Sequence, residues 1–208
     1  MFTTPEDWAL VAREMFAKAP DARAQFIDFD RLVAQELCDK GAWNELEGFY
    51  AEAALGSLKP AEHEKVFGCS TAAFEAGVLG MLRDILPRAQ KDRQIKAIYC
   101  EYTLDANNLC RLTTHLCTAF SPDDEQWATN TLIRKDTIHG PAVAEVFPGV
   151  IGPRKDTLAS NISLAYANAR LLAAWGRAVE TLNPTLPLAF SRHHAPVVRL
   201  MPRQTTKK

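Results

Sequence analysis

The sequence lacks the short motifs and the charge bias that identify many classes of protein. Neither of the glycine-rich patterns that bind nucleotide phosphates, G-x-G-x-x-G and G-x-x-x-x-G-K-[ST], occurs in it. This excludes the commonest phosphate-binding folds. The 24 basic and 25 acidic residues give a formal net charge of −1, so no overall field favours a nucleic acid or an anionic membrane. We expect neither of these as a partner.

Cysteine and long apolar runs are also scarce. The five cysteines form no Cys-x-x-Cys pair and lie within apolar segments, which predicts reduced, buried thiols rather than a disulfide framework. The first residues, MFTTPEDW, have neither the basic nor the apolar region of a secretory signal. The longest uncharged stretch, Thr157 to Ala169, is too short and too polar to span a hydrocarbon layer of about 30 Å. These features predict a soluble, cytoplasmic protein, and no motif indicates a cofactor.

Helical patterns cover most of the chain. Its 208 residues, 47% of them hydrophobic, are enough for one sizeable core, and we expect a single domain over 1–208. Thr4 to Asp7 has the form of a capping box, and Gly41 fits the C-cap of a later helix. The longest helix is expected at about 158–182, where apolar residues cover most of the circumference.

Two segments in the middle of the chain are typical of β-strands. Ile95 to Leu104 and Leu109 to Phe120 are rich in β-branched and aromatic residues, and they flank turn-forming residues at 105–108. Side chains alternate between the two faces of a strand, which divides the hairpin into a core face and a polar face. The core face is predicted to contain Ile98, Cys100, Tyr102, Leu104, Cys110, Leu112, Leu116 and Phe120. The polar face is predicted to stay exposed. It contains Lys96 if the first strand bulges, or otherwise Tyr99 and Glu101, together with Arg111, Thr113, His115 and Cys117.

The flanking segments complete the predicted organisation. A basic connector precedes the hairpin, and a subdomain boundary, if there is one, is expected near 88–95. Ser121 to Glu125 combines a serine cap, a proline and three acids, which predicts the start of a helix. Lys135 to Pro141 is interpreted as a break. The tail 183–208 has four prolines and no acidic residue, so it is predicted to be extended and partly packed on the body.

Together these patterns predict a helix-dominated α+β fold. Amphipathic helices form its N-terminal part, an antiparallel hairpin at about 95–120 lies in the centre, and a long apolar helix follows. A hairpin is not stable alone in water. The hairpin must therefore lie on the helices or pair with further strands.

Metal binding is one candidate for the hairpin. Cysteine and histidine are ligands that zinc uses, and four of them fall in a short span: Cys100, Cys110, His115 and Cys117. Alternation places the first two on one face and the last two on the other. We therefore expect no metal site here.

Catalysis on the polar face is a second candidate. A thiol needs an adjacent base to become a nucleophile, and His115 and Cys117 share a strand face that also carries Glu101. No glycine-rich or strained turn surrounds the thiol. Because that feature of many nucleophiles is missing, a small hydrolase or transferase that uses these three residues is the alternative interpretation and not the preferred one.

The preferred interpretation is a non-enzymatic protein-binding module, such as an inhibitor or an immunity-like protein that neutralises a toxin. Its motivation is a cluster of acids that would form a rim and dock a basic partner protein. The acids of this rim are Glu101, Asp105, Asp123, Asp124 and Glu125. Complementary charge of this kind favours fast and specific association. A solvated helix start explains the last three acids equally well.

Overall fold

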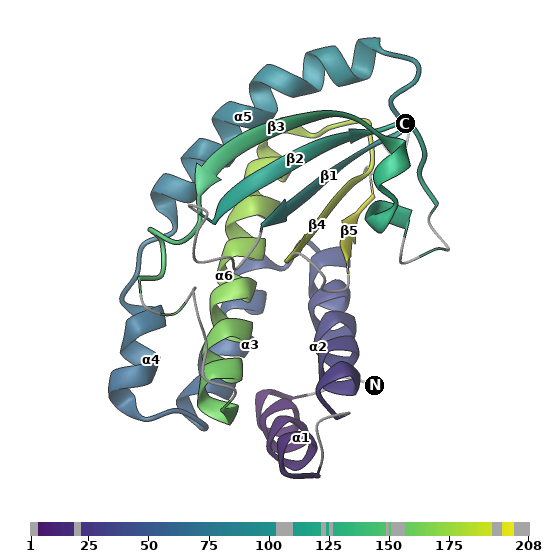
Figure 1. Ribbon diagram of the computed structural model, residues 1–208. Coiled ribbons are helices and arrows are strands. Elements are labelled where there is room, and N and C mark those ends of the chain that lie inside the picture. The colour runs from purple at the N-terminus through teal and green to yellow at the C-terminus, as the bar shows by residue number, and fades with distance from the viewer. Residues whose placement is uncertain are drawn as a thin grey trace, which may run out of the picture.

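The computed structural model describes residues 4–18, 22–102, 110–121, 124, 127–148, 150, 157–192 and 197–201, which contain six α-helices and a five-stranded sheet (Figure 1). The helices are α1 (Pro5–Lys18), α2 (Ala22–Asp39), α3 (Trp43–Leu55), α4 (Pro60–Phe67), α5 (Ala72–Lys91) and α6 (Leu158–Leu182). The strands are β1 (Ala97–Tyr102), β2 (Arg111–Cys117), β3 (Arg134–Ala142), β4 (Leu188–Arg192) and β5 (Val198–Leu200). Two 3₁₀ turns, η1 (Trp127–Thr129) and η2 (Thr131–Ile133), precede β3. The helix-dominated α+β fold that the sequence predicts is confirmed.

The sheet is mixed and has the strand order β3-β2-β1-β4-β5, so the predicted hairpin forms its centre. β1 pairs antiparallel with β2, and Tyr99 lies opposite His115. β4, which follows α6, pairs parallel with the other side of β1 and places Ser191 opposite Glu101. β3 and β5 form the two edges. This order brings residues from the middle and from the end of the chain side by side.

Helix α6 lies against one face of the sheet (Figure 1). The Trp175 ring of α6 contacts the Phe190 ring of β4, with 5.3 Å between centroids, and Phe190 in turn contacts Tyr102 of β1 at 5.8 Å. α3 and α5 also pack on α6. Because α6 has neighbours on several sides, most of its residues are buried. No helix in the described ranges is both long and apolar enough to cross a membrane.

The alternation of faces holds within the two central strands but not beyond them. β2 ends at Cys117, so Phe120 does not follow its parity and packs instead against Trp127 on the opposite face, at 5.1 Å between centroids. Leu104 lies outside the described residues. The face predicted to stay exposed is mostly covered: every residue of β1 is buried, because Trp127, Ala128 and Val197 lie over it.

Two local predictions in the second half of the chain need correction, and a third agrees with the structure. Ser121 Oγ accepts a hydrogen bond from the Asp124 amide at 3.2 Å, as a cap would, but the described residues that follow form only η1 and η2. The expected break at 135–141 is strand β3, whose edge position tolerates its glycine and proline. The tail is extended, as predicted, and its extended segments are β4 and β5.

A partly buried carboxylate joins the first three helices. Asp30 of α2 accepts hydrogen bonds from Trp8 Nε1 of α1 at 3.1 Å and from the Tyr50 hydroxyl of α3 at 2.5 Å. The Trp8 ring contacts the rings of both Phe26 and Tyr50 at 5.3 Å. Burial raises the pKa of Asp30 to about 6, although both hydrogen bonds oppose the shift. The folded protein therefore favours the protonated acid.

Asp30 should make the unfolding free energy depend on pH. Its pKa is about 6 in the folded state against 3.8 for an ordinary aspartate, so the native chain binds the proton more tightly. The contribution of Asp30 to stability should be fully present below about pH 4 and should be lost, by roughly 3 kcal/mol, as the pH rises to about 6 and beyond. Asp30→Asn keeps an oxygen acceptor without the charge and should abolish this fall in urea denaturation curves. Asp84→Asn, at an exposed carboxylate of α5, should leave it unchanged.

Two glycines of α5 should respond to alanine with opposite signs. A Cβ on Gly77 would lie 2.9 Å from Pro141 Cβ on β3 and 3.2 Å from its Cγ, whereas a Cβ on Gly80 would meet nothing within 4 Å. Gly80→Ala should therefore raise the unfolding free energy by about 1 kcal/mol, which is the difference in helix propensity between alanine and glycine. Gly77→Ala should lower it by 1 kcal/mol or more, of the order expected for overpacking. Thermal unfolding compares them, and a gain at both positions would show that α5 does not press on β3.

Candidate functional site

A cluster of polar side chains lies on the sheet face opposite α6. Glu101 of β1 is at its centre: Oε1 lies 3.0 Å from His115 Nε2 on β2 and 2.9 Å from Arg134 Nη1 at the start of β3. Oε2 accepts a hydrogen bond from the Tyr99 hydroxyl at 3.1 Å. The Tyr99 oxygen lies 2.6 Å from Ser191 Oγ on β4. The cluster thus draws on four adjacent strands, and only the sheet order brings it together.

The imidazole of His115 shares its two nitrogens among three partners. Nδ1 lies 3.0 Å from Thr137 Oγ1, and Nε2 lies 3.1 Å from Arg134 Nη1 as well as 3.0 Å from Glu101 Oε1. Nε2 can donate to the carboxylate in one tautomer and accept from the guanidinium in the other. The Thr137 hydroxyl can either donate to Nδ1 or accept from it. Both ring nitrogens therefore have a hydrogen-bond partner in either tautomer.

This cluster is closed to solvent. Glu101 is 7% exposed and His115 is 5% exposed. Arg134 closes the cluster from the side: its guanidinium lies 5.4 Å from the centre of the Tyr99 ring and donates to the Ala128 carbonyl at 3.1 Å. A substrate would have to displace Arg134 from Glu101, and one partner of a buried ion pair is costly to remove. The geometry is that of an ion-pair cluster that joins strands.

Cys117, the nucleophile of the alternative interpretation, has the properties of an inert thiol. Its Sγ donates to the backbone carbonyl of His115 at 3.7 Å rather than to the imidazole. Burial raises its pKa to about 12, although Arg134 opposes the shift. At neutral pH roughly one thiol in 10⁵ is then ionised, and the thiolate is the nucleophile. The structure brings Glu101 and His115 together, and it leaves Cys117 unactivated.

Of the five acids in the predicted rim, only Glu101 and Asp124 lie in the described residues. Glu101 is buried against Arg134 and His115, so it does not belong to an exposed rim. Asp124 is exposed. Asp105, Asp123 and Glu125 lie outside the described residues. Docking of a basic protein at these acids remains a prediction.

The four candidate zinc ligands are divided between the two faces of the sheet, as alternation predicts. Cys100 and Cys110 belong to the core under the helices, whereas Cys117 belongs to the second cluster and His115 stacks on the Tyr99 ring beside it. In the part of the chain that the structure describes, no group of three or more His, Cys, Asp or Glu side chains is placed to hold a metal ion. All five cysteines are free thiols.

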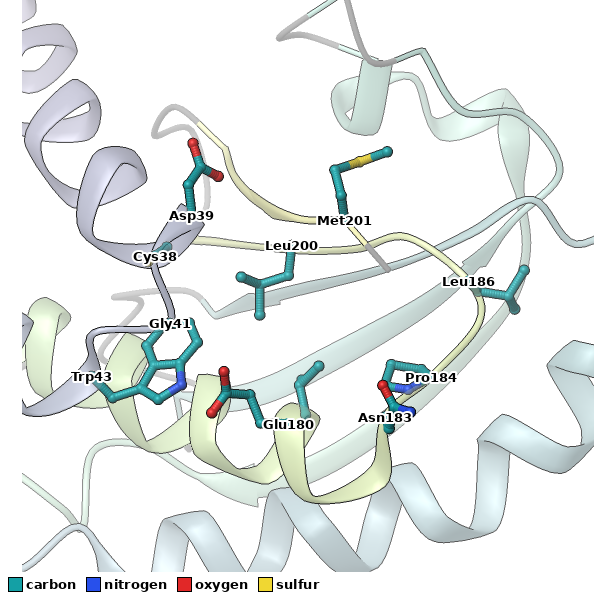
Figure 2. Close-up of a pocket in the computed structure, with 11 residues that line it drawn as sticks. Cys38, Asp39, Gly41, Trp43, Glu180, Asn183, Pro184, Leu186, Leu200 and Met201 are labelled. Atoms are coloured by element: carbon teal, nitrogen blue, oxygen red, sulfur yellow. The ribbon is translucent and has the colours of Figure 1, made fainter. Parts of the chain in front are cut away.

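A separate pocket of about 430 Å³ lies where α2, α6 and β5 end. In Figure 2, Leu200 and Met201 lie along one side of it and Glu180 and Asn183 along the other, with Trp43 at one end and Leu186 at the opposite end. The full lining is Cys38, Asp39, Gly41, Trp43, Val179, Glu180, Asn183, Pro184, Leu186, Leu200 and Met201. Its volume lies within the range of small-molecule sites.

Two helix ends shape this pocket. Gly41 has φ of 65° and ends α2 in a Schellman motif: its amide donates to the Cys38 carbonyl at 2.9 Å, and the Ala42 amide donates to the Leu37 carbonyl at 3.1 Å. Asn183 ends α6 with φ of 43°, and its amide donates to two carbonyls of the last turn. Both reversals turn the chain sharply and leave space between the two helix ends.

Trp43 is held at the end of the pocket by a close contact with α6. A Cβ on Gly176 would lie only 2.5–2.6 Å from three atoms of the Trp43 six-membered ring, so the indole rests directly on the backbone of that helix. Trp43 is 5% exposed, yet its Nε1 has no hydrogen-bond partner. Figure 2 shows the edge of the ring that carries this nitrogen turned toward Glu180. A buried N–H without an acceptor is costly, and a ligand in the pocket can supply one.

Gln35 of α2 fixes the wall that β5 contributes. Its side-chain amide donates to the Arg199 carbonyl at 2.8 Å and accepts from the Arg199 backbone amide at 2.8 Å. Both backbone groups of this edge-strand residue therefore have a hydrogen-bond partner. Gln35 Nε2 also lies 2.7 Å from Asp39 Oδ1. One side chain therefore ties the strand wall to a carboxylate at the pocket.

Nothing in the sequence indicates this pocket. The sequence predicts a helix end at Gly41 and a tail that packs on the body, but not that the two meet. The chain matches no protein-family model, and neither curated proteins nor solved structures provide a match.

Proposed function

We propose that this protein is a non-enzymatic binding protein that holds a small organic molecule in the pocket between α2, α6 and β5. The observation that carries the proposal is the indole N–H of Trp43, which is buried in the pocket wall without an acceptor. A few polar groups set in a mostly apolar wall are typical of ligand sites. The leucine, valine, proline and methionine side chains of the lining supply that wall.

A binding role is favoured over catalysis because the other polar cluster is occupied by its own members. Glu101 lies within hydrogen-bond distance of both His115 and Arg134, and burial disfavours the thiolate of the adjacent Cys117. The pocket lining, in turn, contains no histidine, the commonest general base. Its cysteine, Cys38, has a pKa that burial raises far above the ordinary value, so it is not a nucleophile at neutral pH.

The proposal is tested with a library of small fragments in equal numbers of neutral, cationic and anionic compounds. Binding is followed through the indole N–H signals of the four tryptophans in nitrogen-15 NMR spectra, with the Trp43 signal identified by its loss in Trp43→Phe. We expect at least one fragment to shift the Trp43 signal downfield, because its N–H gains an acceptor, and to raise the melting temperature.

Two variants make this test specific to the pocket. Met201 is 53% exposed at the pocket wall, so Met201→Trp should fill the opening, preserve the fold and remove the fragment-induced shift. Trp127→Phe changes a tryptophan on the opposite sheet face and should leave fragment binding unchanged. If no fragment shifts the Trp43 signal, or if fragments act equally on Met201→Trp, the pocket is not a ligand site.

A further inference from the structure

The pocket between α2, α6 and β5 has a buried floor and an exposed rim. Three lining residues form the floor: Trp43, Cys38 and Val179 are 5%, 2% and 4% exposed, respectively. Asn183 and Met201 of the lining are exposed and belong to the rim. A ligand therefore loses its water at the floor and keeps part of it at the rim. The group that meets the floor decides which class of compound binds.

The floor offers one hydrogen-bond donor in a fixed place. Trp43 Nε1 has no hydrogen-bond partner. The indole is held where it lies, because a Cβ on Gly176 would be only 2.5–2.6 Å from three atoms of its ring. An unpaired buried N–H is costly, and an acceptor that reaches it removes this cost. A hydrocarbon of the same shape leaves the cost in place, so the floor favours a compound with an acceptor at its inner end.

The acceptor at the floor should be uncharged. The Cys38 thiol is neutral there, because burial raises its pKa, and none of the described residues that line the pocket is a lysine, arginine or histidine. A carboxylate that is buried without a positive partner costs far more than a neutral oxygen. A carbonyl oxygen, by contrast, is an acceptor that the single N–H of Trp43 can satisfy.

We infer that this pocket takes an uncharged carbonyl compound, such as a ketone or an amide, whose oxygen accepts a hydrogen bond from the Trp43 indole. The carbonyl enters first, and the apolar remainder of the ligand lies along Leu200 toward Leu186, at the end of the pocket opposite Trp43 (Figure 2). The inference rests on the proposed function, since it names the class of ligand for the same site.

Three probes of nearly the same shape test this inference. Acetophenone carries the carbonyl, α-methylstyrene has a CH₂ group in place of that oxygen, and benzoate is anionic. In nitrogen-15 NMR spectra acetophenone should move the Trp43 indole N–H signal downfield, because this N–H gains an acceptor, whereas α-methylstyrene should not. Benzoate should bind at least about tenfold more weakly than acetophenone in titrations.

A variant measures the hydrogen bond itself. Because α-methylstyrene is the more apolar probe, the affinity of each probe is compared between the wild type and Trp43→Phe. The substitution should weaken acetophenone about tenfold more than it weakens α-methylstyrene, since only the ketone loses a hydrogen bond. Trp127→Phe, on the opposite sheet face, should leave both affinities unchanged.

Substituted ketones test the direction in which the ligand enters. A methyl group on the acetophenone ring, para to the carbonyl, would point toward the rim and should change the affinity by less than about threefold. A tert-butyl group in place of the acetyl methyl would keep the oxygen away from the fixed indole. That ketone should bind at least about tenfold more weakly and leave the Trp43 signal in place.

The outcomes separate the class of ligand from the existence of the site. If α-methylstyrene moves the Trp43 signal downfield as acetophenone does, or if Trp43→Phe weakens both probes equally, selection for a carbonyl is overturned while the ligand site stands. The first of these results needs no variant. Benzoate that binds as tightly as acetophenone would overturn the selection for an uncharged ligand. If the whole fragment library leaves the Trp43 signal unmoved, the proposed function falls as well.

Discussion

Gly176→Ala is expected to lower the free energy of unfolding by about 3 kcal/mol, the upper part of the range for overpacked cores. The new methyl would lie 2.5 Å from Cη2 and Cζ3 of Trp43 and 2.6 Å from its Cζ2. These are atoms of a rigid ring, so the contact cannot be relieved by a rotamer change at the end of a flexible chain. Either α6 moves away from α3 or the indole leaves its place at the pocket. Urea denaturation measures the loss of stability.

The same substitution in a Trp43→Phe background should cost much less. Phenylalanine has no second ring to occupy the place of the Trp43 six-membered ring on Gly176, so the two effects should not add, and a coupling energy of about 2 kcal/mol is expected from the double-mutant cycle. Gly80→Ala serves as the matched helical control, since it adds the same methyl in open space. Additive effects of Trp43→Phe and Gly176→Ala would show that the indole does not rest on α6.

Glu101→Leu should destabilise the fold by about 3–5 kcal/mol, which is the usual cost of removing one partner of a buried ion pair. Arg134 and His115 would lose the carboxylate that now lies 2.9 Å and 3.0 Å from them. The Tyr99 hydroxyl would lose one of its partners as well. Four strands meet at this cluster, so the loss should appear in global unfolding rather than in local fraying. Equilibrium denaturation at neutral pH measures it.

Removing the positive partner together with Glu101 distinguishes an ion-pair cluster from simple packing. In Glu101→Leu with Arg134→Met neither charge remains buried, so the double variant should be more stable than Glu101→Leu alone. Glu47→Leu provides a more exposed comparison, because that carboxylate is 25% exposed where it pairs with Arg177 at 2.7 Å. It should cost far less. A double variant less stable than both single variants would contradict this view of the cluster.

The hairpin shows how far alternation carries a prediction. Ile98, Cys100 and Leu112 lie in the core and Tyr99 and Cys117 on the opposite face, because strand geometry fixes which side chains share a face. Exposure of that second face could not be deduced from the same pattern. Its cover comes from η1 and from Val197, segments whose sequence gives no sign of where they lie.

Segments without strong local preference were predicted least well. Arg134 to Ala142 contains a glycine and a proline and alternates only weakly, so it resembled a loop, yet it pairs with β2 over most of its length. Ser121 has a helix cap's hydrogen bond, but the residues described after it form 3₁₀ turns. In both segments pairing or packing with distant residues outweighed local propensity.

The sequence by itself determined the features that depend on neighbours along the chain. These are the helix-dominated α+β class, the capping box of Thr4 and Asp7, the helix end at Gly41 and the faces of the central strands. Only the tertiary structure decided that Glu101 meets His115 and Arg134, and that α2 and α6 end at the same pocket beside Trp43. The physical reason is that hydrogen bonds within a turn or a strand face are fixed by local backbone geometry. Contacts between residues a hundred positions apart depend instead on strand order and helix packing, which the whole chain settles together.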